Sequence, residues 1–284
     1  MINKIILKDV KKEYENFQLG ELSFAIPKGY ITGLIGKNGQ GKTTTIKSIL
    51  SFINFEGDIL VDDSSNLKLD FLQRTGIVMD EPLLAKAWNM TIVNKVMAIG
   101  YEDWNAEKFF NFLKRFDIPL KSKVVDLSRG MKIKLMLSIA LSHNANLLIL
   151  DEPTSGLDPG MRDEFADIIQ EFVEEEENTV LFSTHITQDL EAIADYIIFI
   201  DDGKLVEFKT KEDFLNTYRV IKGSPSEFEK IDCNIILGSK RSSVAFEALI
   251  RSEEEYNISS DIICENATIE NIMVLYGRGR NERY

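Results

Sequence analysis

The feature that most constrains this chain is a glycine-rich loop between a predicted strand and a predicted helix. Residues 31–35 (ITGLI) suit a buried strand, and residues 36–43 (GKNGQGKT) follow them directly. The loop fits the pattern G-x-x-x-x-G-K-[ST], in which backbone N–H groups curl around a chain of phosphates. The helix that begins at the end of the loop adds partial positive charge at the same place. The sequence therefore predicts a triphosphate-binding site on an α/β fold.

The lysine and threonine that close this pattern have specific expected roles. We expect Lys42 to reach the β- and γ-phosphates, and the hydroxyl group of Thr43 to coordinate Mg²⁺. The expected nucleotide contacts in this segment are Gly36, Asn38, Gly39, Gly41, Lys42, Thr43 and Thr44. The competing interpretation, a purely structural glycine turn, explains the glycines but not the strand and helix on either side.

A pair of acidic residues follows a second apolar strand. Residues 147–150 (LLIL) lead directly into Asp151 and Glu152, and open α/β sheets bind ligands at the carboxyl ends of their strands. We expect Asp151 to hold the metal ion and Glu152 to polarise a water molecule for attack on the terminal phosphate. Two surface acids after a core strand would explain this segment alone. Together with the glycine-rich loop, the pair predicts hydrolysis of the bound triphosphate.

Composition limits the partners and the compartment. The 284 residues include 33 basic and 46 acidic side chains, a formal net charge of −13. Because an acidic chain repels phosphate backbones, we expect no nucleic-acid partner. The apolar runs are far shorter than the roughly 20 residues that span a bilayer, and the first residues have no signal-peptide layout. The two cysteines, Cys233 and Cys264, form no metal or disulfide pattern, so we expect a cytoplasmic protein.

The remaining pattern predicts an α/β main domain and a small addition. Short alternating runs before residue 36 indicate antiparallel strands, and the stretch from about residue 50 to 120 reads as mostly helical. Beyond residue 127 strands and helices alternate, which is typical of a parallel sheet covered on both faces. After about residue 210 we expect short strands near residues 219–221, 235–237 and 262–263 and a final helix. This predicts a small C-terminal α+β extension over residues 211–284.

An ordered set of further motifs resembles the ABC ATPase family. Residues 127–131 (LSRGM) resemble its signature, normally LSGGQ, and residues 155–158 (SGLD) match its D-loop. Residues 183–185 (STH) put His185 at a strand end, where the family has its switch histidine. Tyr14 lies where the family has an aromatic residue that stacks on adenine, although Phe17 is close enough to serve instead.

The resemblance covers residues 1–210, the expected ABC ATP-binding domain, and implies both its architecture and its mechanism. It implies a P-loop NTPase core with an antiparallel β subdomain and a helical subdomain at about residues 83–140. ATP and Mg²⁺ would bind between two such subunits, a homodimer or a heterodimer, paired head to tail. Ser128 and Gly130 of one subunit would face the γ-phosphate held by the other, beside the catalytic Glu152 and His185. His185 would act as a neutral donor to that phosphate.

The resemblance also implies partners. The subunits would power a separate transmembrane permease from the cytoplasmic face of the cell membrane, in a transporter of the ABC-2 exporter type. The second histidine, His143, has no comparable context and is expected to be structural.

Three positions depart from the family pattern. Arg129 stands in place of a signature glycine, and Met131 in place of the signature glutamine. Asp80 stands where the family usually has a glutamine that contacts Mg²⁺ and water. We still expect Asp80 to reach the metal ion, with an altered metal affinity.

Two other classes of ABC protein are the alternatives. A soluble ABC ATPase that acts on the ribosome or on nucleic acid usually carries a second cassette, a zinc cluster or a long coiled coil, and this sequence has none of them. A catalytically inactive regulatory partner would lack part of the set Lys42, Asp151, Glu152 and His185, which is complete here. The sequence therefore favours a transporter ATPase.

Overall fold

The computed structural model describes residues 2–174 and 178–278, which form two compact units, Met1–Val206 and Glu207–Tyr284. The first unit is built on a six-stranded sheet with the order β10-β9-β3-β8-β7-β6. Its strands are β3 (Ile31–Ile35), β6 (Thr75–Val78), β7 (Leu147–Asp151), β8 (Thr179–Thr184), β9 (Tyr196–Asp201) and β10 (Lys204–Thr210). From β9 to β6 the neighbouring strands pair in parallel. The carboxyl ends of β3, β7 and β8 therefore meet at one edge of the sheet.

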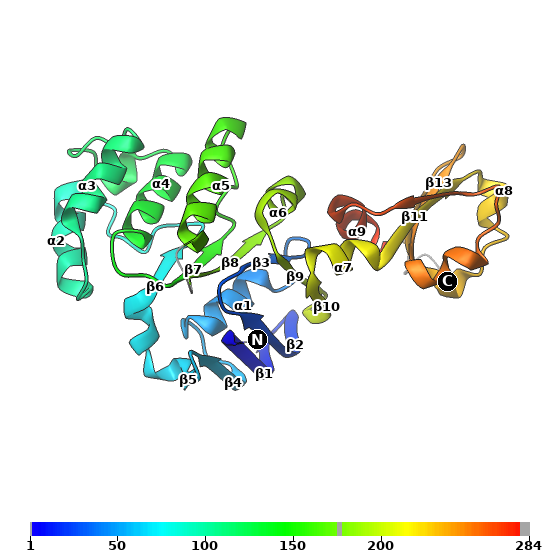
Figure 1. Cartoon of the computed structure of the whole chain (residues 1–284), viewed down its shortest axis with the longest axis horizontal. Coiled ribbons are helices and arrows are strands. Elements are labelled where there is room, and N and C mark those ends of the chain that lie inside the picture. The colour runs from blue at the N-terminus through cyan, green and yellow to red at the C-terminus, as the bar shows by residue number, and fades with distance from the viewer. Residues whose placement is uncertain (1, 175–177, 279–284) are drawn as a thin grey trace. The chain divides into compact units, whose positions relative to one another are not determined.

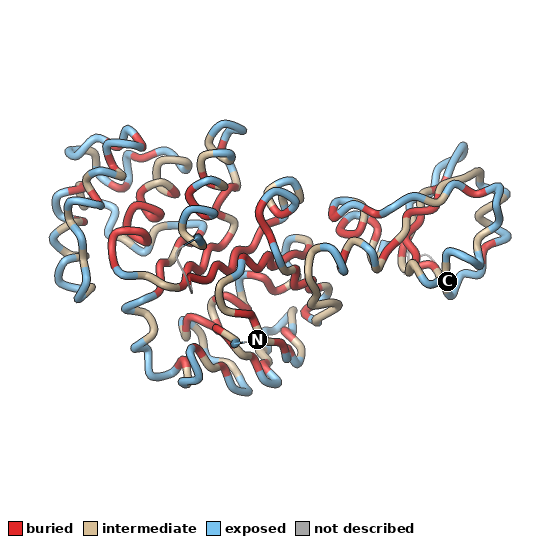
Figure 2. Tube along the Cα trace, in the orientation of Figure 1, coloured by how far each residue is buried: buried red, intermediate tan, exposed pale blue. Residues whose placement is uncertain are grey.

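Helices cover both faces of this sheet. Every residue of β3, β7 and β8 is buried, so these strands need apolar cover on each side. In Figure 1, α4 (Arg129–Ala140), α5 (Pro159–Glu174) and α6 (Thr187–Ile193) lie on one side, and α1 (Lys42–Ile49) lies on the other. The central strands accordingly run as a continuous buried band in Figure 2.

A second, antiparallel sheet adjoins α1 and has the order β2-β1-β4-β5. Its strands are β1 (Asn3–Tyr14), β2 (Phe17–Pro27), β4 (Glu56–Val61) and β5 (Ser64–Ser65). The expectation of mostly helical structure after residue 50 is wrong up to residue 78. That stretch contains β4, β5 and β6, with only the short 3₁₀ helices η1 (Asn66–Lys68) and η2 (Asp70–Arg74). β4 has only a three-residue apolar run, of which Ile59 and Val61 are buried, too short a signal to identify a strand.

Three helices of the first unit fall within residues 83–140. They are α2 (Met90–Gly100), α3 (Ala106–Arg115) and α4, and the short η3 (Val124–Asp126) precedes α4. The side chains of Asn89 and Asn105 cap α2 and α3 by accepting hydrogen bonds from backbone N–H groups of the first turn, as expected for N-cap asparagines. Phe109 and Leu113 form the buried stripe of α3.

The second unit is a small α+β unit. Its antiparallel sheet has the order β12-β13-β11-β14 and a buried apolar core that includes Ile221, Phe246 and Ile250. The elements are α7 (Lys211–Asn216), β11 (Tyr218–Gly223), α8 (Pro225–Phe228), η4 (Cys233–Ile235), β12 (Ile236–Arg241), β13 (Phe246–Arg251), η5 (Ser252–Asn257), β14 (Ile263–Asn266) and α9 (Ile269–Leu275). The predicted class, an α/β core with an antiparallel sheet, a helical part and an α+β extension, is confirmed. Over residues 2–174 and 178–278, no helix is long and apolar enough to cross a membrane.

Candidate nucleotide site

The glycine-rich loop connects β3 to α1 and requires glycine at two positions. Gly36 has φ 157°, and a Cβ atom there would lie 2.4 Å from the carbonyl oxygen of Ile200. Gly41 has φ 106°, and a Cβ atom there would lie 2.6 Å from the side chain of Leu19. Any larger residue would push the loop away from its neighbours, because these distances are well below van der Waals contact. The glycines therefore fix the tight turn that leads into α1.

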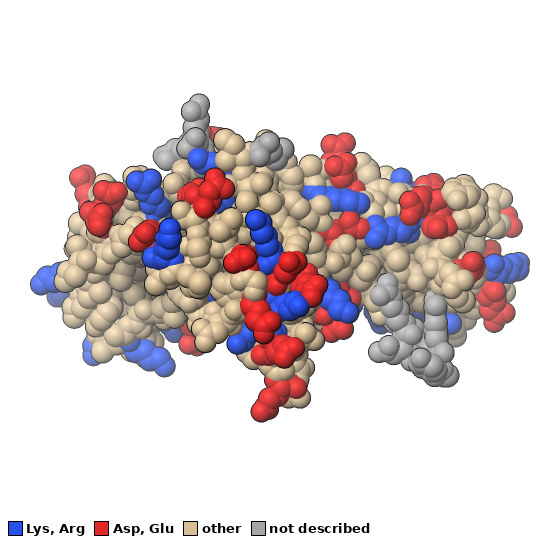
Figure 3. Space-filling view, turned by 90° about the horizontal axis from the view of Figure 1, so that it is seen from below, with Lys and Arg blue, Asp and Glu red and all other residues tan. Residues whose placement is uncertain are grey.

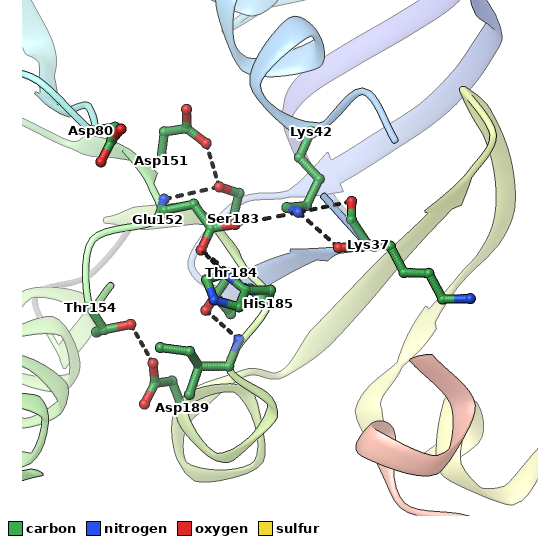
Figure 4. Close-up of polar contacts among 12 residues, drawn as sticks. Lys37, Lys42, Asp80, Asp151, Glu152, Thr154, Ser183, Thr184, His185 and Asp189 are labelled. Atoms are coloured by element: carbon green, nitrogen blue, oxygen red, sulfur yellow. Dashed lines mark hydrogen bonds and ion pairs between the residues drawn. The ribbon is translucent and has the colours of Figure 1, made fainter. Parts of the chain in front are cut away.

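Lys42, the first residue of α1, folds back over this loop. Its Nζ donates hydrogen bonds to the carbonyl oxygens of Gly36 at 2.8 Å and Lys37 at 3.3 Å. The same atom lies 3.3 Å from Oε1 of Glu152 (Figure 4). Lys42 is only 5% exposed, and a buried ammonium group needs such partners. These contacts join the loop to the acidic pair after β7.

Asp151 links three separate elements through its two carboxylate oxygens. Oδ2 accepts a hydrogen bond from the Thr43 hydroxyl of α1 at 2.8 Å, and Oδ1 accepts one from the Ser183 hydroxyl of β8 at 2.5 Å. Asp151 and Ser183 are register partners in the parallel pair β7–β8. Ser183 was not predicted to be a site residue. A hydroxyl residue at the end of a buried strand was nevertheless a signal that it lies near the carboxyl end of β7.

Glu152 has an unusual backbone conformation. Its φ is 50°, in the left-handed region that long side chains rarely adopt. Its backbone N–H donates to the backbone oxygen and to the hydroxyl group of Ser183, both at 3.1 Å. Its side-chain Oε2 lies 2.6 Å from Nδ1 of His185 and also accepts from the His185 backbone N–H at 3.3 Å. The turn thus directs the carboxylate between Lys42 and His185, as Figure 4 shows.

A cavity of about 590 Å³ lies between the glycine-rich loop and the acidic pair, a size typical of small-molecule sites. The lining residues are Phe17, Asn38, Gly39, Gly41, Lys42, Thr43, Thr44, Asp80, Arg129, Asp151, Glu152, Ser155 and His185. Ten of the predicted site residues are therefore brought together. Phe17, the predicted alternative to Tyr14, also lines the cavity. Arg129 and Ser155 line it as well and were not among the predicted site residues.

Four predicted site residues lie outside this lining. Gly36, the first residue of the loop, packs against the backbone of Ile200. Tyr14 lines a neighbouring cavity, whereas Phe17 lines both, so Phe17 is the aromatic residue beside the loop. Ser128 caps α4, its hydroxyl accepting a hydrogen bond from the backbone N–H of Met131 at 3.2 Å, and Gly130 is in the first turn of that helix.

Asp80, which was predicted to contact the metal ion, is paired with Arg129 in the structure. Oδ1 of Asp80 lies 2.5 Å from a terminal guanidinium nitrogen of Arg129. Opposite charges at this distance attract. The contact was not predicted, because Asp80 and Arg129 lie 49 positions apart in the sequence. The structure therefore gives Asp80 a partner other than Thr43 or Asp151.

The oxygen atoms of Thr43 and Asp151 suit a hard cation that also binds phosphate oxygens. In the described part of the chain, no group of three or more His, Cys, Asp and Glu side chains is arranged to hold a metal ion. Mg²⁺ usually binds through one or two carboxylates together with water and substrate phosphates. The Thr43 hydroxyl and the Asp151 carboxylate, in contact with each other at the cavity wall, fit that requirement.

Charged side chains elsewhere are mixed in sign. On the face drawn in Figure 3, acidic and basic side chains of the described residues lie interspersed, without an extended basic area.

Known proteins are similar to this chain in sequence and in fold. The profile of the family described as ABC transporter matches residues 19–155. The lantibiotic transport ATP-binding protein SrtF of Streptococcus pyogenes is 33% identical over 205 residues, which cover 70% of this chain and 88% of that protein. The energy-coupling factor transporter ATP-binding protein EcfA2 of Clostridioides difficile is 30% identical, and the match covers 92% of each chain. A solved structure of an ATP-binding subunit of an ABC transporter has a TM-score of 0.66 and 26% identity, covering 74% of this chain and 90% of that one.

This chain therefore belongs to the ABC transporter family. It is an ATP-binding subunit, an ATPase of the class that works with transmembrane components of a transporter.

Proposed function

We propose that this subunit binds ATP with Mg²⁺ in the described cavity and hydrolyses it to power export through a separate transmembrane permease. The observation that carries the proposal is the contact between the Thr43 hydroxyl and Asp151 at 2.8 Å. It joins the phosphate-binding loop to the acidic pair, so that a triphosphate on the loop would have its terminal phosphate beside Glu152.

Lys42 would exchange partners when the nucleotide binds. In the structure its ammonium group contacts the loop carbonyl oxygens and Oε1 of Glu152. The β- and γ-phosphates offer more negative charge than one carboxylate and would attract Lys42 away from Glu152. This exchange would leave Oε1 of Glu152 available to a water molecule.

Thr43 and Asp151 would hold Mg²⁺, which supplies charge neutralisation on the phosphate oxygens when bound. Ser183 holds the second carboxylate oxygen of Asp151 and would keep the first one directed at the ion. Asp80 is left out of this proposed ligand set because Arg129 holds its carboxylate.

Glu152 would act as the general base. Oε1 would accept a proton from the attacking water, while His185 holds Oε2 and so fixes the carboxylate plane. In-line attack on the terminal phosphate needs a water molecule held on the side of the phosphorus atom opposite the leaving oxygen. The left-handed turn at Glu152 supports this role because it directs the side chain out of the strand and into the cavity.

A second subunit would complete the site. Ser128 and Gly130 do not line the cavity of their own chain, yet they lie at the N-terminal start of α4, and a helix N-terminus is suited to bind phosphate. Head-to-tail pairing with another copy, or with a related subunit, would bring this start of α4 to the γ-phosphate. ATP would then stabilise the pair, and hydrolysis would release it.

The transport role is supported by the family and by the motifs that resemble ABC-2 exporters. SrtF is named for lantibiotic transport. We propose that this chain acts with a separate membrane subunit. We propose that it lies at the cytoplasmic face of the cell membrane, bound to that subunit.

Two experiments test this function. ATP binding to Lys42→Ala should fall below detection in a titration, whereas Lys47→Ala, in the same helix but away from the cavity lining, should bind as the parent does. Equal affinities of the Lys42→Ala variant and the parent would remove the phosphate-loop assignment. Purification of the tagged chain from solubilised membranes should recover a transmembrane subunit. Recovery on ribosomes or DNA would instead favour a soluble ABC ATPase.

A further inference from the structure

Two residues that depart from the family pattern contact each other although 49 positions separate them. Asp80 follows β6, and Arg129 is the first residue of α4. We propose that Arg129 is a positioning residue that neutralises Asp80 at the wall of the nucleotide cavity. The pair would thus take the place of the neutral glutamine and glycine found in the family. This inference rests on the proposed function of the cavity.

The charges around the cavity show why Asp80 needs a partner. Three carboxylates line it, those of Asp80, Asp151 and Glu152. Glu152 is paired with Lys42, and Asp151 accepts hydrogen bonds from two hydroxyl groups. Arg129 is the cation among the described lining residues that contacts Asp80. Without it, Asp80 would present an uncompensated negative charge to a triphosphate, which carries several negative charges of its own.

Packing fixes the path of the Arg129 side chain. A Cβ atom at Gly156 would lie 3.4 Å from Cδ of Arg129 and 3.8 Å from its Nε. The stem of Arg129 therefore passes over the D-loop glycine, which has φ 83°, on its way to Asp80. The contact thus connects three segments around the cavity: the end of β6, the start of α4 and the D-loop.

The pair contributes little to folding stability by itself. The side chains of Arg129 and Asp80 are 52% and 61% exposed, and exposed ion pairs have small net stability effects because water screens them. Its main effect is therefore electrostatic and local, on ligands that enter the cavity beside it. A metal ion at Asp80 would have to displace the guanidinium group, so the pair also argues against Asp80 as a metal ligand.

A double-mutant cycle tests this inference. ATP affinity is measured by calorimetric titration, with Mg²⁺ and with EDTA, for the parent, Asp80→Asn, Arg129→Gln and the double variant. Arg129→Gln should weaken ATP binding about threefold to tenfold in both conditions, since the exposed carboxylate acts on the phosphates themselves. Asp80→Asn frees the Arg129 cation and should bind ATP at least as tightly as the parent, the double variant should bind as the parent does, and Arg129→Lys, which keeps the charge, should remain close to it.

A variant of another exposed ion pair is the control for this experiment. Arg115→Gln removes a comparable exposed pair with Glu164, 3.0 Å apart, whose residues do not line the cavity, and should leave ATP affinity unchanged. If Asp80→Asn weakens binding only with Mg²⁺ while Arg129→Gln does not weaken it, Asp80 is a metal ligand and the inference is overturned. Equal affinities throughout the cycle would also overturn it. Failure of the parent to bind ATP would instead remove the proposed function, and this inference with it.

Discussion

The imidazole ring of His185 contacts the carboxylate of Glu152, with 2.6 Å between Nδ1 and Oε2. An ionised carboxylate only accepts hydrogen bonds, so Nδ1 carries the proton in this contact. Neutral His185 then presents Nε2 as an acceptor, and only the imidazolium form could also donate from Nε2 to a phosphate. The role expected from the sequence, a neutral donor to the γ-phosphate, therefore requires the Glu152 contact to open.

Substitution of His185 separates its role in orienting Glu152 from a role as a donor to the γ-phosphate. An asparagine can place an N–H donor near the position of Nδ1, whereas an alanine cannot. We expect His185→Ala to lower turnover about tenfold to a hundredfold through loss of Glu152 orientation, and His185→Asn to lower it less, with ATP affinity unchanged in both. Turnover is measured by phosphate release, and ATP affinity is measured by titration. Identical turnover of the two variants would show that the Nδ1 donor does not position Glu152.

Glu152→Gln removes the proposed general base and keeps the shape of the side chain. Turnover should fall by about 10²–10⁴, the usual effect of losing a general base, while ATP still binds. Because ATP then persists, the variant should form a dimer of twice the mass on sizing columns with ATP. Glu164→Gln, a change in a surface residue of α5 that pairs with Arg115, is the matched control and should hydrolyse ATP normally. Normal hydrolysis by Glu152→Gln would assign the base elsewhere.

Removal of the divalent cation tests Thr43 and Asp151. With EDTA, hydrolysis should stop and ATP should bind more weakly. Asp151→Asn should raise the Mg²⁺ concentration needed for half-maximal turnover by at least about tenfold, because it removes a charged ligand. Ser183→Ala, which keeps Asp151 but removes the hydroxyl that contacts its second oxygen and the Glu152 backbone N–H, should give a smaller increase. If both variants keep the Mg²⁺ requirement of the parent, Asp151 does not hold the ion.

His143 predicts a pH dependence of stability. Its ring is buried, stacks on Tyr101 with 4.0 Å between centroids, and lies 3.1 Å from the carbonyl oxygen of Ile139. Burial lowers the pKa of His143, and the nearby Lys108 adds to this lowering. The folded state thus favours the neutral ring, so stability is complete above the unfolded pKa of about 6.5 and decreases as the pH falls below it.

Urea unfolding at a series of pH values between about 5 and 8 measures this effect. The unfolding free energy of the parent should decrease below about pH 6.5, and that of His143→Phe should depend less on pH. Equal slopes for the parent and His143→Phe would show that His143 is not responsible.

The parts of the fold that were predicted have strong local signals. β7 and β8 are continuous apolar runs, and α3 has both an N-cap asparagine and an apolar stripe. β4 and β6 were missed because they are short and gain their stability from partners distant in sequence, β1 and β7. β13 was missed as well, although its apolar residues lie at the centre of the second sheet.

The candidate site shows the same division between local and distant signals. The loop and the acidic pair have recognisable local patterns, and the structure brings them together. The pairing of Asp80 with Arg129, the support of Asp151 by Ser183 and the position of Phe17 all depend on which segments become neighbours. Linear spacing carries no information about such contacts, because each joins elements separated by other strands and helices.

The left-handed backbone at Glu152 has a consequence for engineering. A residue with a side chain in this conformation costs about 1–2 kcal/mol that glycine does not incur. A change to glycine here would remove this backbone cost together with the carboxylate and its contacts to Lys42 and His185. A melting temperature sums these opposite effects and does not report the loss of the proposed base, so any stabilisation programme for this protein must score ATP turnover alongside melting.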